Sequence, residues 1–245
     1  MIEIDGDGVS IKPDGIKWVI NPYDEFAVEE ALRIREVHGG SVTIVSAGRE
    51  KAAEAIRTAL AMGADKGVLV ADPALENCDG LGTATVLAKA VKELPHELII
   101  AGQRAVDDDN FLVGAAVAEK LGMPLISMVF KEEVKDGKIT CHKTVDGGSV
   151  VVEAALPVLF TTQRGLNEPR YASLPGIMKA KKKPLDTKSL ADLGVNPAEV
   201  GDPKTKVVGL KTPPERTAGQ MIEGESATEK AAALVRVLHE EAKVI

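Results

Sequence analysis

Two spacings of apolar residues divide the first half of the chain into short and long stretches. Runs of four or five apolar residues are typical of buried strands, whereas longer stretches with apolar positions at i, i+3, i+4 and i+7 are typical of helices with one buried face. Because the two kinds alternate over short connections, the pattern predicts a parallel sheet with helices on both faces. The predicted strands are 42–45, 67–71 and 97–101, and the predicted helices are 22–38, 50–62, 81–94 and 109–121.

Local signals support the first of these helices. Asn21 is a favoured residue just before a helix, and Pro22 suits the first helical position. Glu29 and Arg33 are four residues apart and can pair on the helix surface. Two glycines at 39 and 40 then predict the end of the helix.

Beyond Pro124 the apolar and polar residues alternate, which predicts hairpin strands. We therefore expect an α/β fold: a doubly wound, mostly parallel sheet with antiparallel strands added at its edge. The predicted strands of this half are 125–134, 138–144, 150–154 and 158–162, with a turn at Asp146-Gly147-Gly148.

The last quarter of the chain has a different character, with short polar stretches and scattered prolines. Residues 206–210 could form a strand, and Ser226 with Glu229 forms a capping box that predicts a final helix. We divide the chain into an α/β domain at 1–184 and a C-terminal arm at 185–245. The final helix either forms a domain of its own or packs on another surface through its apolar face, which consists of Leu234, Val235 and Leu238.

Composition excludes several classes of protein. The 245 residues are 44% hydrophobic and 27% charged, which is ordinary for a soluble globular protein. A net charge of −7 and an aromatic content of 3% argue against nucleic-acid binding. No apolar run is long enough for a membrane helix, and the acidic N-terminus is unlike a signal peptide. The two cysteines, Cys78 and Cys141, lie far apart and are expected to be reduced and structural.

Candidate ligand-binding residues follow two of the predicted strands. In open parallel sheets, ligands bind at the carboxyl ends of strands. Ser46, Ala47 and Gly48 are small enough to let a ligand approach the backbone, and the segment 102–114 opens a helix whose free N–H groups could bind an anion. Three consecutive aspartates stand at 107–109, and Asp109 would cap that helix. The alternative is that the aspartates only cap the helix and the segment binds no phosphate. Since the chain has no recognisable catalytic motif, a carrier whose chemistry belongs to a bound cofactor fits best.

The segment 165–184 is unusual for the middle of a domain, because it combines three prolines and five basic residues with several apolar ones. Pro175 can open a short helix over roughly 175–182, with Leu174 extended at the corner before it and pointing outward. The alternative is a surface connection whose apolar residues fold back onto the core.

This segment, read as GLNEPRYASLPGIMKAKKKP, resembles the signature loop of the electron transfer flavoprotein β subunit. The resemblance covers most of the chain and implies a fold like that of the adenine-nucleotide hydrolases. It extends through NPYDEFAVEEALRIRE (21–36), IRTALAMGAD (56–65), AGQRAVDDDNFLVG (101–114) and TVDGGSVVVEAALP (144–157).

The resemblance implies a heterodimer in which an α subunit holds most of an FAD and the β subunit buries a structural AMP. The C-terminal arm would wrap the α subunit. The loop would dock acyl-CoA dehydrogenases, with electrons passing on to a quinone-side oxidoreductase, in the bacterial cytoplasm or the mitochondrial matrix. The implied cofactor contacts are Tyr23 near the flavin and Ser46, Ala47, Gly48, Ala105, Asp108, Asp109, Asn110, Phe111, Leu112 and Val113 at the AMP. The implied docking residues are Tyr171, Leu174, Pro175, Ile177, Met178 and Lys179, followed by the basic run at 179–183.

Two alternatives stay open. One branch of the family bifurcates electrons and holds a second FAD in place of AMP; the LNEPRYASLP loop and the DDD triplet resemble the other branch. Leu112 stands where the family commonly has glutamine, so a polar contact to the nucleotide is lost. The second alternative is a stand-alone nucleotide sensor similar to a universal stress protein.

The first residues give one further expectation. Family members open with an apolar strand in the middle of the sheet, whereas residues 1–5 are too polar for a central parallel strand. We expect the natural protein to be longer at its N-terminus, and the sheet to be interrupted at that strand's position unless another segment fills it.

Overall fold

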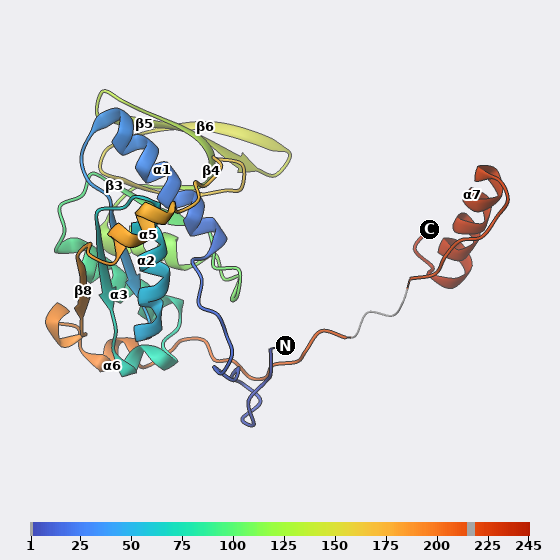
Figure 1. Ribbon diagram of the computed structural model, residues 1–245, viewed down its shortest axis with the longest axis horizontal. Helices are drawn as coiled ribbons and strands as arrows, with labels where there is room; N and C mark the ends of the chain where they lie inside the picture. The colour runs from blue at the N-terminus through green and yellow to red at the C-terminus, as the bar shows by residue number, and fades with distance from the viewer. Residues whose placement is uncertain (1, 215–218) are drawn as a thin grey trace. The chain divides into compact units, whose positions relative to one another are not determined.

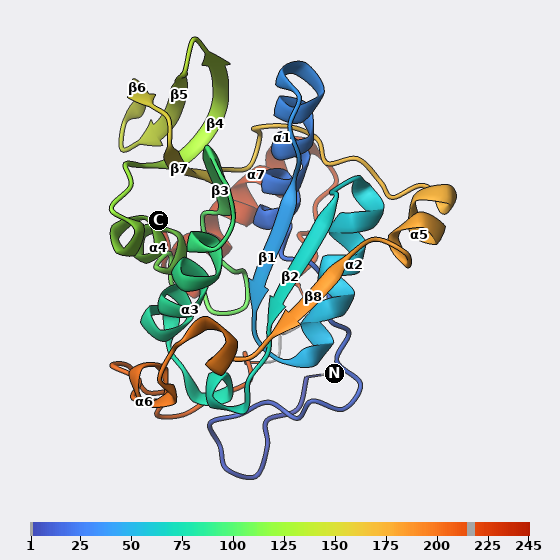
Figure 2. The same ribbon diagram turned by 90° about the vertical axis from the view of Figure 1, so that its left-hand side faces the viewer.

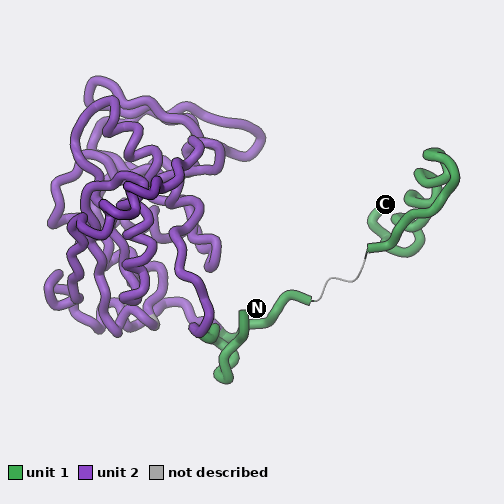
Figure 3. The backbone as a smooth tube through the Cα atoms, in the orientation of Figure 1, with its two compact units in different colours: residues 1–12, 208–245 green, residues 13–207 purple. Residues whose placement is uncertain are grey.

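The computed structural model describes residues 2–214 and 219–245, which form two compact units (Figure 3). The larger unit is Pro13–Val207 and holds every named strand. The smaller one combines residues 2–12 with the described part of 208–245. Each is described separately below. Residues 185–207, which the sequence analysis assigns to the arm, belong to the larger unit.

The larger unit contains a three-stranded parallel sheet (Figure 2). Its order is β1 (Thr43–Ala47), β2 (Lys66–Val70) and β8 (Leu185–Lys188). Thr43 lies opposite Lys66, and Gly67 lies opposite Leu185. The sequence pattern predicted the first two strands and missed β8, since LDTK offers only one apolar residue to the pattern.

A second sheet has five strands in the order β3-β7-β4-β5-β6. The first three run parallel, and β5 pairs antiparallel with β4 on one side and with β6 on the other. The predicted α/β class and its antiparallel edge strands are therefore confirmed. The bounds are β3 (Leu98–Gly102), β4 (Leu125–Lys135), β5 (Lys138–Val145), β6 (Gly148–Ala155) and β7 (Val158–Thr162).

The sheet is split in two rather than continuous. β1 ends one sheet and β3 ends the other, and no described strand pairs with their outer edges. Residues 2–5 belong to neither sheet: Ile4 forms only an isolated antiparallel bridge with Ile11.

Alternate residues of single strands face different helices, which makes the fold doubly wound. On β2, Leu69 packs in one cluster with Leu32 of α1 and Leu60 of α2, while Val70 packs on the other face with Val86 of α3. On β7, Leu159 faces α3 and α4, and Phe160 faces the hairpin core. The helices are α1 (Pro22–His38), α2 (Ala53–Met62) after η1 (Glu50–Ala52), α3 (Gly80–Lys92) after η2 (Pro73–Asn77), and α4 (Val113–Leu121); the first three are labelled in Figure 1 and α4 in Figure 2.

One predicted helix start and one predicted strand are wrong. The helix expected from Asp109 begins at Val113, because residues 109–112 form no helical turn and Asp109 and Phe111 take left-handed conformations. Residues 206–210 form no strand; the N–H of Leu210 donates instead to Gly8 O, at 2.8 Å.

Short helices complete the chain. The larger unit has α5 (Leu174–Ala180), η3 (Ala191–Leu193) and α6 (Pro197–Val200). The smaller unit has α7 (Ala227–Arg236) and the π-helical turn η4 (Val237–Glu241). Half of the predicted capping box is present: the N–H of Glu229 donates to Ser226 Oγ at 3.2 Å, whereas the Glu229 carboxylate accepts from the N–H of Glu225, one residue before the cap.

Candidate functional site

The carboxyl ends of β1, β2 and β3 lead into loops that meet at one edge of the larger unit. Gly48, just after β1, donates from its N–H to Val70 O at the end of β2, at 3.0 Å. Gly80, at the start of α3, lies against the loop that follows β3, since a Cβ atom there would be 3.0 Å from Leu112 Cδ2. Parallel strands commonly place ligands at this edge. The predicted Ser46, Ala47 and Gly48 therefore lie at its β1 end.

The loop 103–112 holds its own acidic side chains. Asp109 does not cap α4 as predicted. It takes a left-handed conformation, with φ 56°, and pairs with Arg104. Asp108 bonds the N–H and the side chain of Asn110. As a result α4 begins without a side-chain cap and without an acidic residue in its first turn, so its first N–H groups are available to an anion.

Arg104 is the centre of the loop, and sequence reasoning missed it. Its guanidinium carbon lies 5.2 Å from the centroid of the Tyr23 ring and 4.8 Å from that of Phe111. Arg104 Nη2 donates to Tyr23 Oη at 3.1 Å. The bond to Tyr23 and the nearby charge of Asp109 raise the pKa of Arg104. In the sequence, the only indication of this role is that Arg104 is a single cation close to three aspartates.

Two side chains attach the start of α1 to the end of β3. Asn21 precedes the helix but does not cap it: its amide donates to Arg104 O at 2.8 Å, and its Oδ1 accepts from the N–H of Val106. Asp24 Oδ1 accepts from the N–H of Gly102 at 2.7 Å, and burial raises the pKa of Asp24. These bonds hold Tyr23 beside the loop.

The arrangement fits an anionic nucleotide. The uncapped start of α4 offers backbone donors, Arg104 offers a cation, and Phe111 offers an exposed ring. Leu112 offers only an apolar side chain. The structure thus brings together the predicted Tyr23, Asp109 and Phe111. Of the other predicted residues, Val113 is the first residue of α4, and the rest lie on the same loop: Ala105, Asp108, Asn110 and Leu112.

A second candidate site is an exposed apolar patch on α5, called the α5 patch below. Tyr171 is 98% exposed and Leu174 is 75% exposed, too much for side chains that fold back onto the core. Ser173 caps the helix, its Oγ accepting from the N–H of Gly176. Leu174 is therefore the first helical residue, not an extended corner as predicted, and Pro175 is the second. The α5 patch consists of Tyr171, Leu174, Ile177 and Met178.

The opposite side of α5 is attached tightly to α2. A Cβ atom at Gly176 would lie 2.6 Å from Ala61 O, so the two backbones are in direct contact. Arg57 Nη1 donates to Ala180 O and to Lys183 O, at 2.6 and 2.8 Å. Lys183 Nζ donates to Leu60 O and Ala64 O. Lys183 is thus not a free charge, which corrects the predicted basic run: its exposed cations are Lys179, Lys181 and Lys182.

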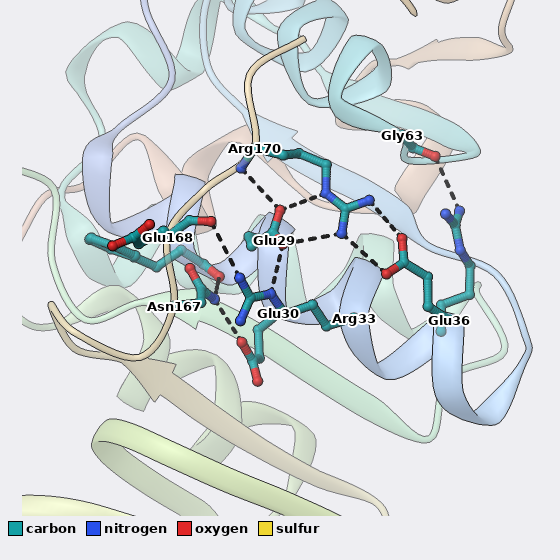
Figure 4. A network of polar contacts seen from close by, with 10 residues as sticks. Glu29, Glu30, Arg33, Glu36, Gly63, Asn167, Glu168 and Arg170 are labelled. Carbon is teal, nitrogen blue, oxygen red and sulfur yellow. Dashed lines mark hydrogen bonds and ion pairs between the residues drawn. The ribbon is translucent and has the colours of Figure 1, made fainter. Parts of the chain in front are cut away.

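The segment before α5 is held by acidic residues of α1 (Figure 4). Arg170 donates from Nε to Glu29 at 2.7 Å and from Nη1 to Glu36 at 2.6 Å. Glu29 also accepts from Arg33, which confirms the predicted i,i+4 pair. Burial opposes ionisation of Glu29, but the bonds from Arg170 and Arg33 outweigh it and lower its pKa. This network was not visible in the sequence, because its partners lie far apart along the chain.

The described residues form neither a membrane-spanning helix nor a metal-binding cluster. Across residues 2–214 and 219–245, no helix is both long and apolar enough to cross a membrane. The same residues contain no group of three or more metal-binding side chains.

Comparison with known proteins gives one family. The electron transfer flavoprotein domain matches residues 9–193. The electron transfer flavoprotein subunit beta of Bacillus subtilis is 43% identical over 236 residues, 96% of this chain and 91% of the relative. The subunit of Bradyrhizobium diazoefficiens is 44% identical over 80% of this chain and 78% of its own length. The bovine subunit is 39% identical over 91% and 87%. The resemblance read from the sequence is confirmed.

Proposed function

The chain belongs to the electron transfer flavoprotein β-subunit family, and from this we propose that it accepts electrons from acyl-CoA dehydrogenases and passes them to a quinone-side oxidoreductase. It works as an electron carrier, in a heterodimer with an α subunit, in the bacterial cytoplasm or the mitochondrial matrix. The carrying observation is the α5 patch: three exposed apolar side chains of α5, with Tyr171 just before it, on a helix whose other side contacts the backbone of α2. Exposed apolar groups on a rigid support are typical of a protein-docking surface.

The cofactors would be an FAD shared with the α subunit and an AMP. FAD, when bound, supplies the redox chemistry. Tyr23 would contact the flavin, held in place by Thr162 Oγ1, which donates to Tyr23 O at 2.7 Å. The N–H groups at the start of α4, with Ser46 to Gly48 at the end of β1, would hold the nucleotide through the backbone. Mass spectrometry of nucleotides released from the purified heterodimer tests this: one FAD and one AMP support electron transfer, whereas two FAD indicate bifurcation.

Substitution of Leu174 by alanine tests the docking role. Burying a leucine contributes about 1.5–3 kcal/mol, and three quarters of this side chain is exposed and available to a partner. We expect Leu174→Ala to weaken docking by about 1–2 kcal/mol, or to raise the KM for the flavoprotein as electron acceptor of an acyl-CoA dehydrogenase about fivefold to thirtyfold. Folding and flavin content should not change.

Val37→Ala is the matched control. Val37 is 77% exposed on α1, so this change removes a similarly exposed apolar side chain outside the α5 patch. It should leave KM unchanged. Equal KM values for wild type and Leu174→Ala would contradict the docking role.

A further inference from the structure

Glu132, on β4, presents a carboxyl group to α1 in a groove that Arg33 and His38 also line. One of its oxygens, Oε2, is buried and has no hydrogen-bond partner among the described residues. Its neighbour on α1 is Glu30, which is itself buried. Leaving two carboxylates together in a buried place is costly, so one of them keeps a proton that forms a hydrogen bond to the other.

The groups around this pair do not replace that proton. On α1, Arg33 is bonded to Glu29, and His38 lies farther along the groove between α1 and β4 that Glu132 also lines. Glu133, next on β4, adds another negative charge. On β5, Cys141 lies opposite Glu132, and burial raises the pKa of its thiol to about 12, so it stays neutral. Burial first, and then Glu30 and Glu133, raise the pKa of Glu132 to about 8.

The pair is connected to the segment that leads into the α5 patch. Glu30 Oε2 accepts from Asn167 Nδ2 at 2.7 Å, and the same amide donates to Phe26 O at 2.9 Å. Asn167 is buried and stands three residues before Arg170, whose own N–H and side chain are held by Glu29. Figure 4 shows Glu30 pointing toward Asn167 beside the Arg170 network.

We propose that Glu132 is a positioning residue for partner docking: its protonated carboxyl holds Glu30 in place, and Glu30 through Asn167 holds the segment that presents the α5 patch. When the pair loses its proton, two negative charges face each other and Glu30 is pushed from Asn167. The segment is then less ordered in the free protein. Ordering it on docking costs free energy, and this cost lowers the affinity for the partner. The inference rests on the proposed docking function of the α5 patch.

The first test measures the segment itself, without any partner. In the FAD-loaded heterodimer, hydrogen-exchange protection of the Arg170 amide is compared at pH 6.5 and pH 9, after correction for the intrinsic exchange rate. We expect protection in the wild type to fall about fivefold, at the lower end of typical coupling between sites. Glu132→Gln keeps an amide donor toward Glu30 at every pH and should hold its protection.

The second test measures docking. The Kd for the acyl-CoA dehydrogenase used in the Leu174 test should rise about fivefold over the same pH range in the wild type and stay level in Glu132→Gln. Glu133→Gln, which removes the neighbouring exposed charge, should keep the pH dependence with a midpoint moved slightly to lower pH. If Glu132→Gln does not fold, Glu132→Met replaces it and should likewise show no pH dependence.

The outcomes separate the two ideas. Parallel pH profiles for the wild type and the Glu132 variant, in protection and in Kd, would overturn the positioning role. If protection follows the prediction but Leu174→Ala leaves Kd unchanged, the docking function is wrong while the proton-dependent link to the segment stands.

Discussion

Replacing Arg170 by methionine would test how strongly the network on α1 holds the segment before α5. Methionine keeps the apolar part of the side chain and removes the guanidinium. The change removes the side-chain bonds to Glu29, at 2.7 and 3.1 Å, and to Glu36, at 2.6 and 3.3 Å. The two carboxylates differ in exposure, with side chains 3% and 50% exposed, so they should not contribute equally.

The magnitude follows from that difference. The bond to the exposed Glu36 contributes about 0–1 kcal/mol, as is usual for surface ion pairs. Loss of one partner of a buried ion pair costs about 3–5 kcal/mol, but Glu29 keeps Arg33 at 2.7 Å, so the cost should be smaller. We expect Arg170→Met to lower the free energy of unfolding by about 2 kcal/mol and Glu36→Gln by about 0.5 kcal/mol.

Urea unfolding of the full chain, followed by far-UV circular dichroism, measures both values. Combining Arg170→Met with Glu29→Gln gives a double-mutant cycle, and a coupling of about 1 kcal/mol or more is expected for residues in direct contact. Arg164→Met is the matched control, because it removes an exposed cation from the same segment that forms no ion pair among the described residues.

The pH dependence gives an independent check. Since the pKa of Glu29 is lowered in the folded protein, its contribution is present above the ordinary value of 4.5 and is lost as the pH falls through the folded value. The difference between wild type and Arg170→Met should therefore shrink in acid. The reasoning is refuted if Arg170→Met costs no more than Glu36→Gln at neutral pH.

Substitutions at Glu132 and Asp79 test two other parts of the structure. The pKa of Glu132 is raised, so its folded form binds the extra proton and the wild type should lose stability as the pH rises from about 4.5 to about 8. Glu132→Gln should match the wild type at pH 5 and be more stable at pH 8 by about 1–2 kcal/mol, since solvent screens a partly exposed carboxyl; equal urea midpoints at pH 8 would contradict this. Asp79 caps α3 with one oxygen and accepts from the N–H groups of Lys204 and Thr205 with the other, at 2.6 and 3.2 Å. Asp79→Ser should keep the cap and cost about 1 kcal/mol, Asp79→Ala about 2 kcal/mol, and both should speed tryptic cleavage after Lys204 and Lys206; unchanged cleavage would show that Asp79 does not hold this segment.

The elements that sequence alone predicted well are those with signals inside a few residues. The bounds 22–38 of α1 agree with the structure because Pro22 at the first helical position and Gly39 after the last turn act on the backbone next to them. The same holds for the helix at 227–236, where Ser226 and Glu229 satisfy neighbouring N–H groups. The short helix α5 was also predicted, from Pro175, but it begins one residue earlier, at Leu174, after a Ser173 cap, and the sequence left open whether its apolar side chains are exposed.

Only the tertiary structure decided the roles of the polar residues. Glu29 and Arg170 are separated by 141 positions, and Arg104 meets a tyrosine 81 positions away. In a sequence, a lysine such as Lys183 reads as a surface charge, whereas in the fold its ammonium group satisfies two carbonyls of α2 and the turn after it. Apolar periodicity and capping act over one or two helical turns, so they can be read along the chain. The pairing of buried charges and the split of the sheet between β1 and β3 depend on which distant segments pack together, and packing settles that only when the whole core forms.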